Sequence, residues 1–289
     1  MPIYGRRAFL GGAASFWACS VAADGPRLAI IDWAMLETAL MLGHTPVAAC
    51  ELERFRTDIE WPTVPDGVID LGLRGAPNME LIQTLQPNLI LSSPWYERMH
   101  TRLRALAPVL SVAVYNTASP PFSEALNALH VVGERLGASG LARRTAENAL
   151  AELEATAGRI SEFRDRPIYV VDIGDARHFR AFGPDSMFGD VLDRLGFENA
   201  WKRPSEFAFS APVPLERLAE RPDARILAVA PIPIEARAAL RRSVLWNRLE
   251  PVAEGRFGVI GTLNPFGGVP AGLLFARFMA NALIGGSVT

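Results

Sequence analysis

Short apolar runs alternate with stretches of helical periodicity along most of the chain. In the first half, runs typical of buried strands lie at residues 28–31, 68–69, 89–91 and 109–114, and helical patterns lie at 33–42, 78–85 and 102–106. In the second half, such runs lie at residues 168–171, 226–229 and 257–260, and helical patterns lie at 188–195 and 270–283. Strands separated by helices predict mostly parallel sheets whose faces are covered by helices.

Two longer helical patterns separate these halves, at residues 122–136 and 141–163. In the second of them, apolar residues recur every three or four positions, as in an amphipathic helix. Such a helix can be an ordinary core helix or a rigid strut between two lobes, and the strand–helix alternation that restarts after it favours the strut. We therefore expect an α/β fold with two lobes, residues 24–138 and 166–289, joined by one long helix at residues 139–165.

The first 23 residues have the features of an export signal. Arg6 and Arg7 form a twin-arginine pattern, residues 11–18 are mostly apolar, and residues 21–23 are small enough for cleavage. The apolar run is much shorter than the roughly 20 residues of a membrane helix. Residues 16–18 match a lipoprotein signal poorly, which disfavours a lipid anchor at Cys19. A disordered tail with two chance arginines is the alternative to a twin-arginine signal and a periplasmic location.

The composition argues against several classes of function. The formal net charge is −2 and both signs are mixed along the chain, so the basic stripe of a nucleic-acid-binding protein is absent. Cys50 is the only cysteine beyond the signal, which excludes an internal disulfide in the remaining chain. Phosphate-loop, nucleophile-elbow and zinc-protease motifs are missing, and the four histidines are far apart in the sequence. We expect neither an enzyme nor a protein-bound metal.

Polar and aromatic side chains follow three of the predicted strands. Trp33 follows the first, Arg74 the second, and Trp95 and Tyr96 the third. The carboxyl ends of parallel strands meet at one edge of a sheet, where ligands commonly bind. Aromatic walls with a few polar groups suit a small molecule, and a cation beside a phenol suits an electron-rich one. Arg74 can also be solvated or paired at the surface, and Trp95 can face the core.

Three segments carry a resemblance to a known family. Their motifs lie at residues 68–74, 77–81 and 86–87, then at 175–178, 182–188 and 199–201, and finally at 214–218, 245–246 and 255–257. With these motifs the chain resembles, from residue 27 to residue 286, the periplasmic ferric hydroxamate-siderophore binding proteins, which are the ferrichrome-type receptors of ABC importers. The resemblance implies two α/β lobes, a long connecting helix, a shallow cleft for the ligand and small opening motions.

The resemblance also implies roles for individual residues. Members of this family contact the iron-bound hydroxamate oxygens with an arginine and a tyrosine, which match Arg74 and Tyr96. The siderophore holds the iron, so the protein needs no metal ligands. Pocket tryptophans of the family fall on Ala208, on Asn264 and near Asp58 in an expected loop at residues 55–61. The second wall is therefore expected to be less bulky and more polar, with candidates at Phe207, Phe209, Asn264 and Phe266; core packing is the alternative for the phenylalanines.

A partner follows from the same resemblance. Permeases of this class present arginines to an acidic residue on each lobe. Glu216 matches the position on the second lobe and Glu97 is the nearest candidate on the first, although a solvated glutamate is the alternative for both. The expected protein is a monomer without an intrinsic cofactor, which captures ferric siderophores and delivers them to an inner-membrane ABC permease.

Other ligands and one other class of function stay open at this point. The same fold could bind cobalamin, haem or a catecholate siderophore, and Arg177 and Arg180 would add positive charge for a catecholate. An exported hydrolase or a siderophore reductase would need a nucleophile–base pair or a cofactor motif, which the sequence lacks.

Overall fold

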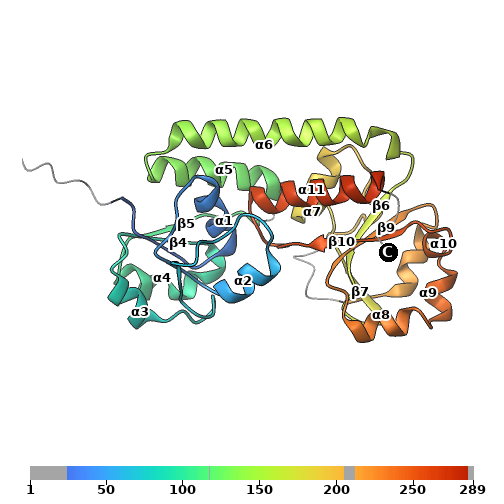
Figure 1. Cartoon of the computed structure of the whole chain (residues 1–289), viewed down its shortest axis with the longest axis horizontal. Helices are drawn as coiled ribbons and strands as arrows, with labels where there is room; N and C mark the ends of the chain where they lie inside the picture. The colour runs from blue at the N-terminus through green and yellow to red at the C-terminus, as the bar shows by residue number, and fades with distance from the viewer. Residues whose placement is uncertain (1–24, 117, 205–211, 286–289) are drawn as a thin grey trace, which may run out of the picture.

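The computed structural model describes residues 25–116, 118–204 and 212–285. Its first lobe is built on a five-stranded sheet with the order β3-β2-β1-β4-β5, in which every pair of neighbours is parallel (Figure 1). The strands are β1 (Leu28–Ile30), β2 (Ala48–Ala49), β3 (Ile69–Asp70), β4 (Leu89–Ser92) and β5 (Val109–Ser111). They alternate with the helices α1 (Trp33–Met41), α2 (Leu52–Asp58), α3 (Met79–Leu85) and α4 (Glu97–Arg104), and with the 3-10 turn η1 (Pro94–Tyr96).

The second lobe has a sheet with the order β10-β9-β6-β7-β8. Its strands are β6 (Ile168–Asp172), β7 (His178–Ala181), β8 (Val213–Pro214), β9 (Arg225–Ala230) and β10 (Phe257–Thr262). The strands β10, β9 and β6 are parallel, whereas β7 and β8 are antiparallel to their neighbours. The helical elements are α7 (Met187–Arg194), η3 (Leu215–Glu220), α8 (Ile234–Leu240), α9 (Val244–Arg248) and α10 (Glu250–Ala253). The predicted α/β class with mostly parallel sheets is confirmed.

Three long helices pack together along one side of the molecule. They are α5 (Pro121–Arg135), α6 (Ser139–Arg159), which is followed by the turn η2 (Ser161–Phe163), and α11 (Val269–Ile284). Figure 1 shows α6 spanning the top of both lobes, with α5 and α11 packed beneath it. Small buried residues of α6, such as Ala142, allow this close approach, and a side chain at Gly133 of α5 would lie 2.5 Å from the Cβ of Ala142.

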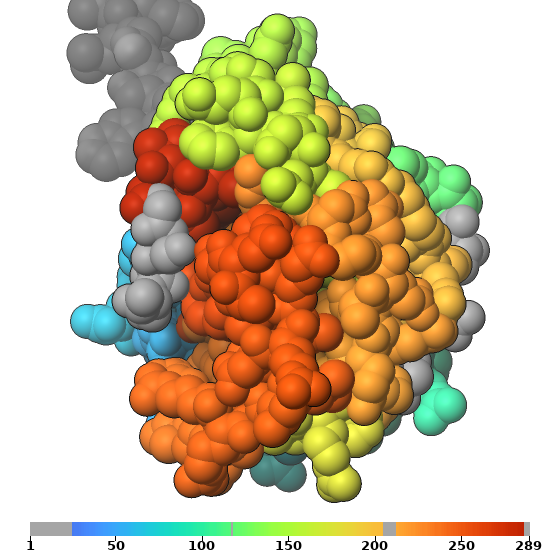
Figure 2. Space-filling view, turned by 90° about the vertical axis from the view of Figure 1, so that its right-hand side faces the viewer, coloured from blue at the N-terminus to red at the C-terminus, as the bar shows by residue number. Residues whose placement is uncertain are grey.

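One apolar core runs through both lobes. It contains Leu28 and Ile30 of the first sheet, Val170 and Ile260 of the second, and Phe275 of α11. A second core lies under α8 to α10, which cover the outer face of the second lobe (Figure 2, orange), and a third lies beneath α3 and α4. No helix among the described residues is long and apolar enough to cross a membrane.

Two elements differ from the expectation. Residues 55–58 are helical where we expected a loop, because the carboxylate of Asp70 accepts hydrogen bonds from the first amides of α2, Leu52 N at 2.8 Å and Glu53 N at 3.3 Å. The helix expected at residues 102–106 starts earlier, at Glu97, directly after the turn that carries Tyr96. The start of α2 depends on Asp70, which is remote in the sequence. The start of α4 depends on the turn that begins at Pro94.

Candidate functional site

Arg74 lies in the loop after β3 and is held from two sides. Its Nε is 2.9 Å from the Oε2 of Glu51, and its backbone nitrogen donates to Oε1 of the same carboxylate at 3.1 Å. Its guanidinium carbon lies 4.3 Å from the centroid of the Trp33 ring. The side chain is 22% exposed, and within the described residues its two terminal nitrogens donate no hydrogen bond. The guanidinium is therefore fixed in direction and keeps donors for a ligand.

Tyr96 closes the turn after β4 and supplies a neutral donor. Burial raises the pKa of its phenol to about 12; the charge of Asp32 acts in the same direction, and that of Arg74 opposes it. Its hydroxyl has no hydrogen-bond partner in the described part of the chain. The phenol therefore keeps its proton at neutral pH and lies within the electrostatic reach of Arg74.

Trp33 packs against Arg74 and exposes little of its ring to the cavity. Its side chain is 5% exposed, its indole nitrogen donates to the carbonyl of Cys50 at 3.0 Å, and its ring meets Phe55 edge to face at 5.2 Å. The expectation of a residue on the rim is thus corrected in part: packing against Phe55 buries most of the ring, and the rest lines the cavity between the lobes.

A cavity of about 260 Å³ lies between the lobes. The first lobe contributes Trp33, Arg54, Asp58 and Ile59, and the second contributes Asp172, Arg180, Phe182, residues 229–231 and residues 262–265. Its charges are paired, Arg54 with Asp58 at 3.0 Å and Arg180 with Asp172 at 3.5 Å. Burial raises the pKa of Asp172, and Arg180 opposes that rise. The cavity therefore combines apolar walls with balanced charge.

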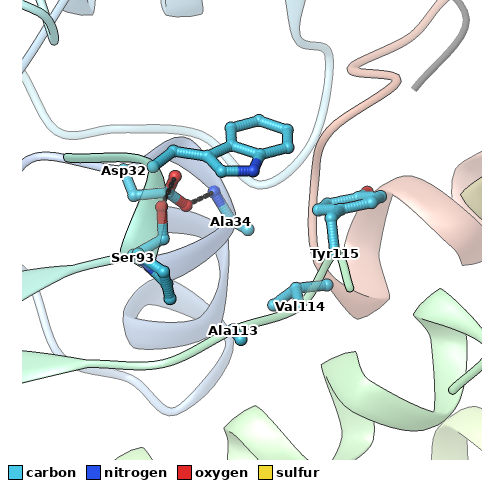
Figure 3. Close-up of a pocket in the computed structure, with 8 residues that line it drawn as sticks. Asp32, Ala34, Ser93, Ala113, Val114 and Tyr115 are labelled. Carbon is cyan, nitrogen blue, oxygen red and sulfur yellow. Dashed lines mark hydrogen bonds between the residues drawn. The ribbon is translucent and has the colours of Figure 1, made fainter. Parts of the chain in front are cut away.

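Beside this cavity lies a smaller hollow with an aromatic cluster. Trp95 is 46% exposed and stacks on Tyr115, with ring centroids 5.7 Å apart, and Phe266 meets Trp95 and Tyr115 edge to face at 5.0 and 5.6 Å. Figure 3 shows Tyr115 across the hollow from Asp32, which lies between Ser93 and the backbone of Ala34. Phe266 follows β10, so the cluster joins residues from both sides of the cleft.

Asp32 is a buried carboxylate within electrostatic reach of Arg74 and Tyr96. It caps α1 by accepting from Ala34 N at 2.8 Å, and it accepts from Ser93 Oγ at 2.9 Å. Burial raises its pKa, while the hydrogen bonds and the charge of Arg74 act against that rise. Its role is to hold the ends of β1 and β4 together, which fixes the turn that carries Tyr96.

Asn264, which we expected in the second wall, is 4% exposed, and its Nδ2 donates to the Oε1 of Glu37 at 2.7 Å. It borders the cavity but belongs to a buried network. Sequence reasoning missed Glu37, although an acid in a helix that is apolar on nearly all sides was a usable signal. Phe266 is partly buried within the aromatic cluster. The candidates Phe207 and Phe209, together with Ala208, lie outside the described residues.

The two docking candidates are on the surface. Glu216 lies in η3 and Glu97 is the first residue of α4; both are exposed, and neither forms an ion pair with any residue that the structure describes. Of the arginines considered for a catecholate, Arg180 borders the cavity and Arg177 is exposed. Among residues 25–116, 118–204 and 212–285, no cluster of three or more metal-ligating side chains occurs.

Comparison with known proteins gives consistent matches. Residues 28–261 match the model of the periplasmic binding protein family. The iron(3+)-hydroxamate-binding protein FhuD of Escherichia coli (strain K12) is 29% identical over 296 residues, which cover 99% of this chain and 98% of that protein.

Solved structures match over nearly the whole chain. The crystal structure of the siderophore-binding protein FhuD from Vibrio cholerae with Fe3+-Desferal superposes with a TM-score of 0.85 at 22% identity, covering 91% of this chain and all of that one. The triscatecholate siderophore-binding protein FeuA from Bacillus subtilis, complexed with ferri-bacillibactin, superposes with a TM-score of 0.68 at 18% identity, covering 90% and 94% of the two chains. At these identities the structures support the fold alone.

Proposed function

The chain belongs to the periplasmic binding protein family, and on that premise we propose that it captures ferric hydroxamate siderophores between its lobes and delivers them to an ABC permease. Members of the family bind solutes and carry out no chemistry on them, so the protein is not an enzyme. The full-length similarity to a hydroxamate-binding relative supports the ligand class. The observation that carries the proposal is that Arg74 and Tyr96 follow β3 and β4 of the same parallel sheet and lie within electrostatic reach of each other.

The chemistry of these two side chains suits the oxygens around a caged ferric ion. Hydroxamate oxygens share negative charge with the metal and accept hydrogen bonds while they coordinate it. The terminal nitrogens of Arg74 can only donate, and the phenol of Tyr96 keeps the proton that it can donate. Both side chains can therefore bind these oxygens without coordinating the iron. The siderophore thus supplies every metal ligand, and the protein needs no intrinsic cofactor.

The charge of the cavity favours a hydroxamate over a catecholate. A ferric trihydroxamate carries little net charge, whereas a ferric triscatecholate carries several negative charges. The ion pairs of Arg54 with Asp58 and of Arg180 with Asp172 leave the cavity nearly balanced, and Arg74 itself is paired with Glu51. A strongly anionic complex would need more unpaired positive charge than these residues provide.

The direct test is a titration of the purified protein with ferric desferrioxamine and with ferrichrome, followed by tryptophan fluorescence. We expect saturable quenching by the iron-loaded hydroxamates and a weaker response to metal-free desferrioxamine, which serves as the control. Tighter binding of a ferric catecholate, of haem or of cobalamin would favour the alternative ligands. Absence of saturable binding to any hydroxamate would refute the proposal.

The remaining parts of the proposal concern export and partners. Glu216 and Glu97 are proposed as the two contacts with permease arginines, one on each lobe. Arg6 and Arg7, which lie outside the described residues, are proposed to direct export by the twin-arginine route, with cleavage near residue 23 and no lipid at Cys19. We propose a monomer with lobes at residues 24–138 and 166–289 around the connecting segment 139–165. Mass determination of the mature protein and its sedimentation test these points.

A further inference from the structure

Glu37 is a fully buried carboxylate that reaches from the first lobe to the start of the last helix. It lies on α1 and is 0% exposed. Its Oε1 accepts from Asn264 Nδ2 at 2.7 Å, its Oε2 accepts from Gly268 N at 2.7 Å, and the backbone of Ala271 donates a further hydrogen bond. We call these four residues the Glu37 network. An isolated buried charge is costly, so three donors to one carboxylate indicate a built arrangement.

The backbone of Phe266 fixes the orientation of the Asn264 amide. The Oδ1 of Asn264 accepts from Phe266 N at 3.1 Å, which leaves the Nδ2 group to face Glu37. Rotating the amide of Asn264 by half a turn would place its NH2 group against the N–H of Phe266. The residue at position 37 must therefore present an acceptor to Asn264, and the position of Phe266 depends on that pairing.

The segment between β10 and α11 is also held by close packing. A Cβ atom at Gly267 would lie 2.5 Å from the Oε2 of Glu37, and one at Gly268 would lie 3.2 Å from the carbonyl oxygen of Ala34. The hydroxyl of Tyr115 also donates to Gly267 O at 2.6 Å. Residues 264–268 are thus held by α1 and by Tyr115, both of which belong to the first lobe.

The donors around Glu37 favour a hydrogen-bond acceptor at this position, whereas burial disfavours a negative charge there. The N-terminus of α11, with its free amides, attracts an anion. Burial nevertheless raises the pKa of Glu37 to about 7, and the charge of Asp32 adds to that rise, although the hydrogen bonds from Asn264, Gly268 and Ala271 oppose it. Tyr115, the other titratable neighbour, stays neutral because burial holds its pKa well above the ordinary value.

We propose that Glu37 is a positioning residue of the binding site, which fixes Phe266 against Trp95 and Tyr115 by holding Asn264 and the N-terminus of α11. In this arrangement the second wall of the site is set from the first lobe. The part of the inference that concerns the ligand rests on the proposed function, whereas the part that concerns the loop stands on the contacts of the Glu37 network alone.

A donor–acceptor swap tests the proposal. Glu37→Gln places a new NH2 group opposite the Nδ2 of Asn264, and Asn264→Asp places two carboxyl groups face to face. The double variant restores complementarity, because the new amide donates to the new carboxylate while its oxygen still accepts from Gly268 N. Glu152→Gln is the matched control: Glu152 also contacts α11, through Arg277 at 2.6 Å, but lies outside the network.

Two measurements distinguish the effect of a variant on the segment 264–271 from its effect on ligand binding. Hydrogen–deuterium exchange reports the amides of residues 264–271, and fluorescence titration reports the affinity for ferric desferrioxamine. We expect each single variant to speed exchange in this segment and to weaken affinity by about tenfold or more, as the loss of a hydrogen bond to a charged group implies. The double variant should recover most of both, and Glu152→Gln should change neither.

The outcomes test the role of Glu37 in the loop and its role in ligand binding separately. Unchanged exchange at residues 264–271 in both single variants would overturn the positioning role. Altered exchange with unchanged affinity would show that Phe266 is no part of the wall, which also overturns the proposal. If the wild-type protein binds no ferric hydroxamate, the proposed function fails, and the exchange data still decide the role of Glu37. If Glu37→Gln does not fold, Asn264→Ala keeps the bond to Gly268 and should speed exchange chiefly at Phe266.

Discussion

The guanidinium carbon of Arg74 lies 4.3 Å from the centroid of the Trp33 ring, while the Nε of Arg74 donates a hydrogen bond to Glu51. This contact orients a long and otherwise flexible side chain before any ligand arrives. The entropy of ordering the arginine is then largely lost during folding, so less of it is lost on binding. The cation–π contact and the ion pair leave both terminal nitrogens without a hydrogen-bond partner among the described residues, so they remain available as donors.

Arg74→Ala should weaken binding of ferric desferrioxamine by about 1.5–3 kcal/mol, the range for hydrogen bonds that involve a charged group. Arg74→Lys should recover only part of this loss, because the three donors of an ammonium group share one nitrogen, which cannot reproduce the planar guanidinium that binds Glu51 and the ligand through separate nitrogens. Fluorescence titration measures both. Arg98→Ala, at an exposed arginine of α4, is the control and should leave affinity unchanged. An unchanged affinity in Arg74→Ala would remove this residue from the site.

Tyr96→Phe should cost about 0.5–1.5 kcal/mol of binding free energy with little change in the free energy of unfolding. The reason is that the hydroxyl bonds to nothing among the described residues, so only the ligand loses a partner. Because the phenol has a pKa of about 12, it should not contribute any pH dependence of affinity between pH 6 and roughly pH 9. Urea unfolding and fluorescence titration check both statements, and Tyr169→Phe, at a tyrosine of β6, controls for a lost hydroxyl elsewhere. A large drop in stability of Tyr96→Phe would contradict this account.

The free energy of unfolding of the wild-type protein should fall as pH rises from 4.5 to about 7, the range in which Glu37 titrates. Its pKa is raised from 4.5 to about 7 in the folded state, so the folded protein binds the proton more tightly than the unfolded chain. The resulting stabilisation is complete below about pH 4.5 and is lost as pH rises to about 7, with a magnitude on the order of 3 kcal/mol. Urea unfolding at pH 5, 6, 7 and roughly 8 measures it.

Glu37→Gln isolates this contribution. Asp172 and Asp190 also have raised pKa values through burial, but they are present in both proteins, so their effects cancel in the difference. Asp32, whose charge acts on Glu37, contributes to the difference together with Glu37. The free energy of unfolding of the wild type, minus that of the variant, should decrease between pH 5 and about 7 and level off above it. A difference that stays constant with pH would show that Glu37 titrates normally.

Glu216→Lys should abolish delivery to the permease and leave siderophore affinity unchanged, since the side chain is exposed and lies apart from the cavity. Charge reversal turns an attractive contact with a permease arginine into a repulsive one. Stimulation of ATP hydrolysis by the permease in proteoliposomes is the measurement. Glu235→Lys, at an acid of the first turn of α8, is the matched control on the same lobe. Full stimulation by Glu216→Lys would place the contact elsewhere.

Sequence patterns placed Arg74 and Tyr96 at strand ends but did not reveal the residues that hold them. Arg74 and Tyr96 could be placed because each follows a short apolar strand and parallel strands end at one edge. The partners of these donors could not, because Glu51 pairs with Arg74 across 23 positions and Glu37 pairs with Asn264 across 227. Such pairs form only after the sheet order and the packing of α11 are set, and neither is encoded in local periodicity.

The long helices α6 and α11 lie where helical patterns predicted them, at residues 141–163 and 270–283. The short strands β2, β7 and β8 were not predicted, because two to four residues carry too little pattern and their pairing depends on neighbours. The same limit explains why Trp33 was expected on the rim: its place in the chain was right, but Phe55, which covers it, comes from a helix whose start depends on Asp70.

The apolar core that continues from the first sheet through α11 into the second has a consequence for how the molecule melts. Lobes with separate cores can unfold one after the other, whereas Leu28 and Ile260 here share a single cluster. Loss of either sheet would expose the apolar face of the other, so neither half is expected to persist alone. Heat or denaturant should therefore produce one cooperative transition, and the first lobe expressed by itself should remain unfolded.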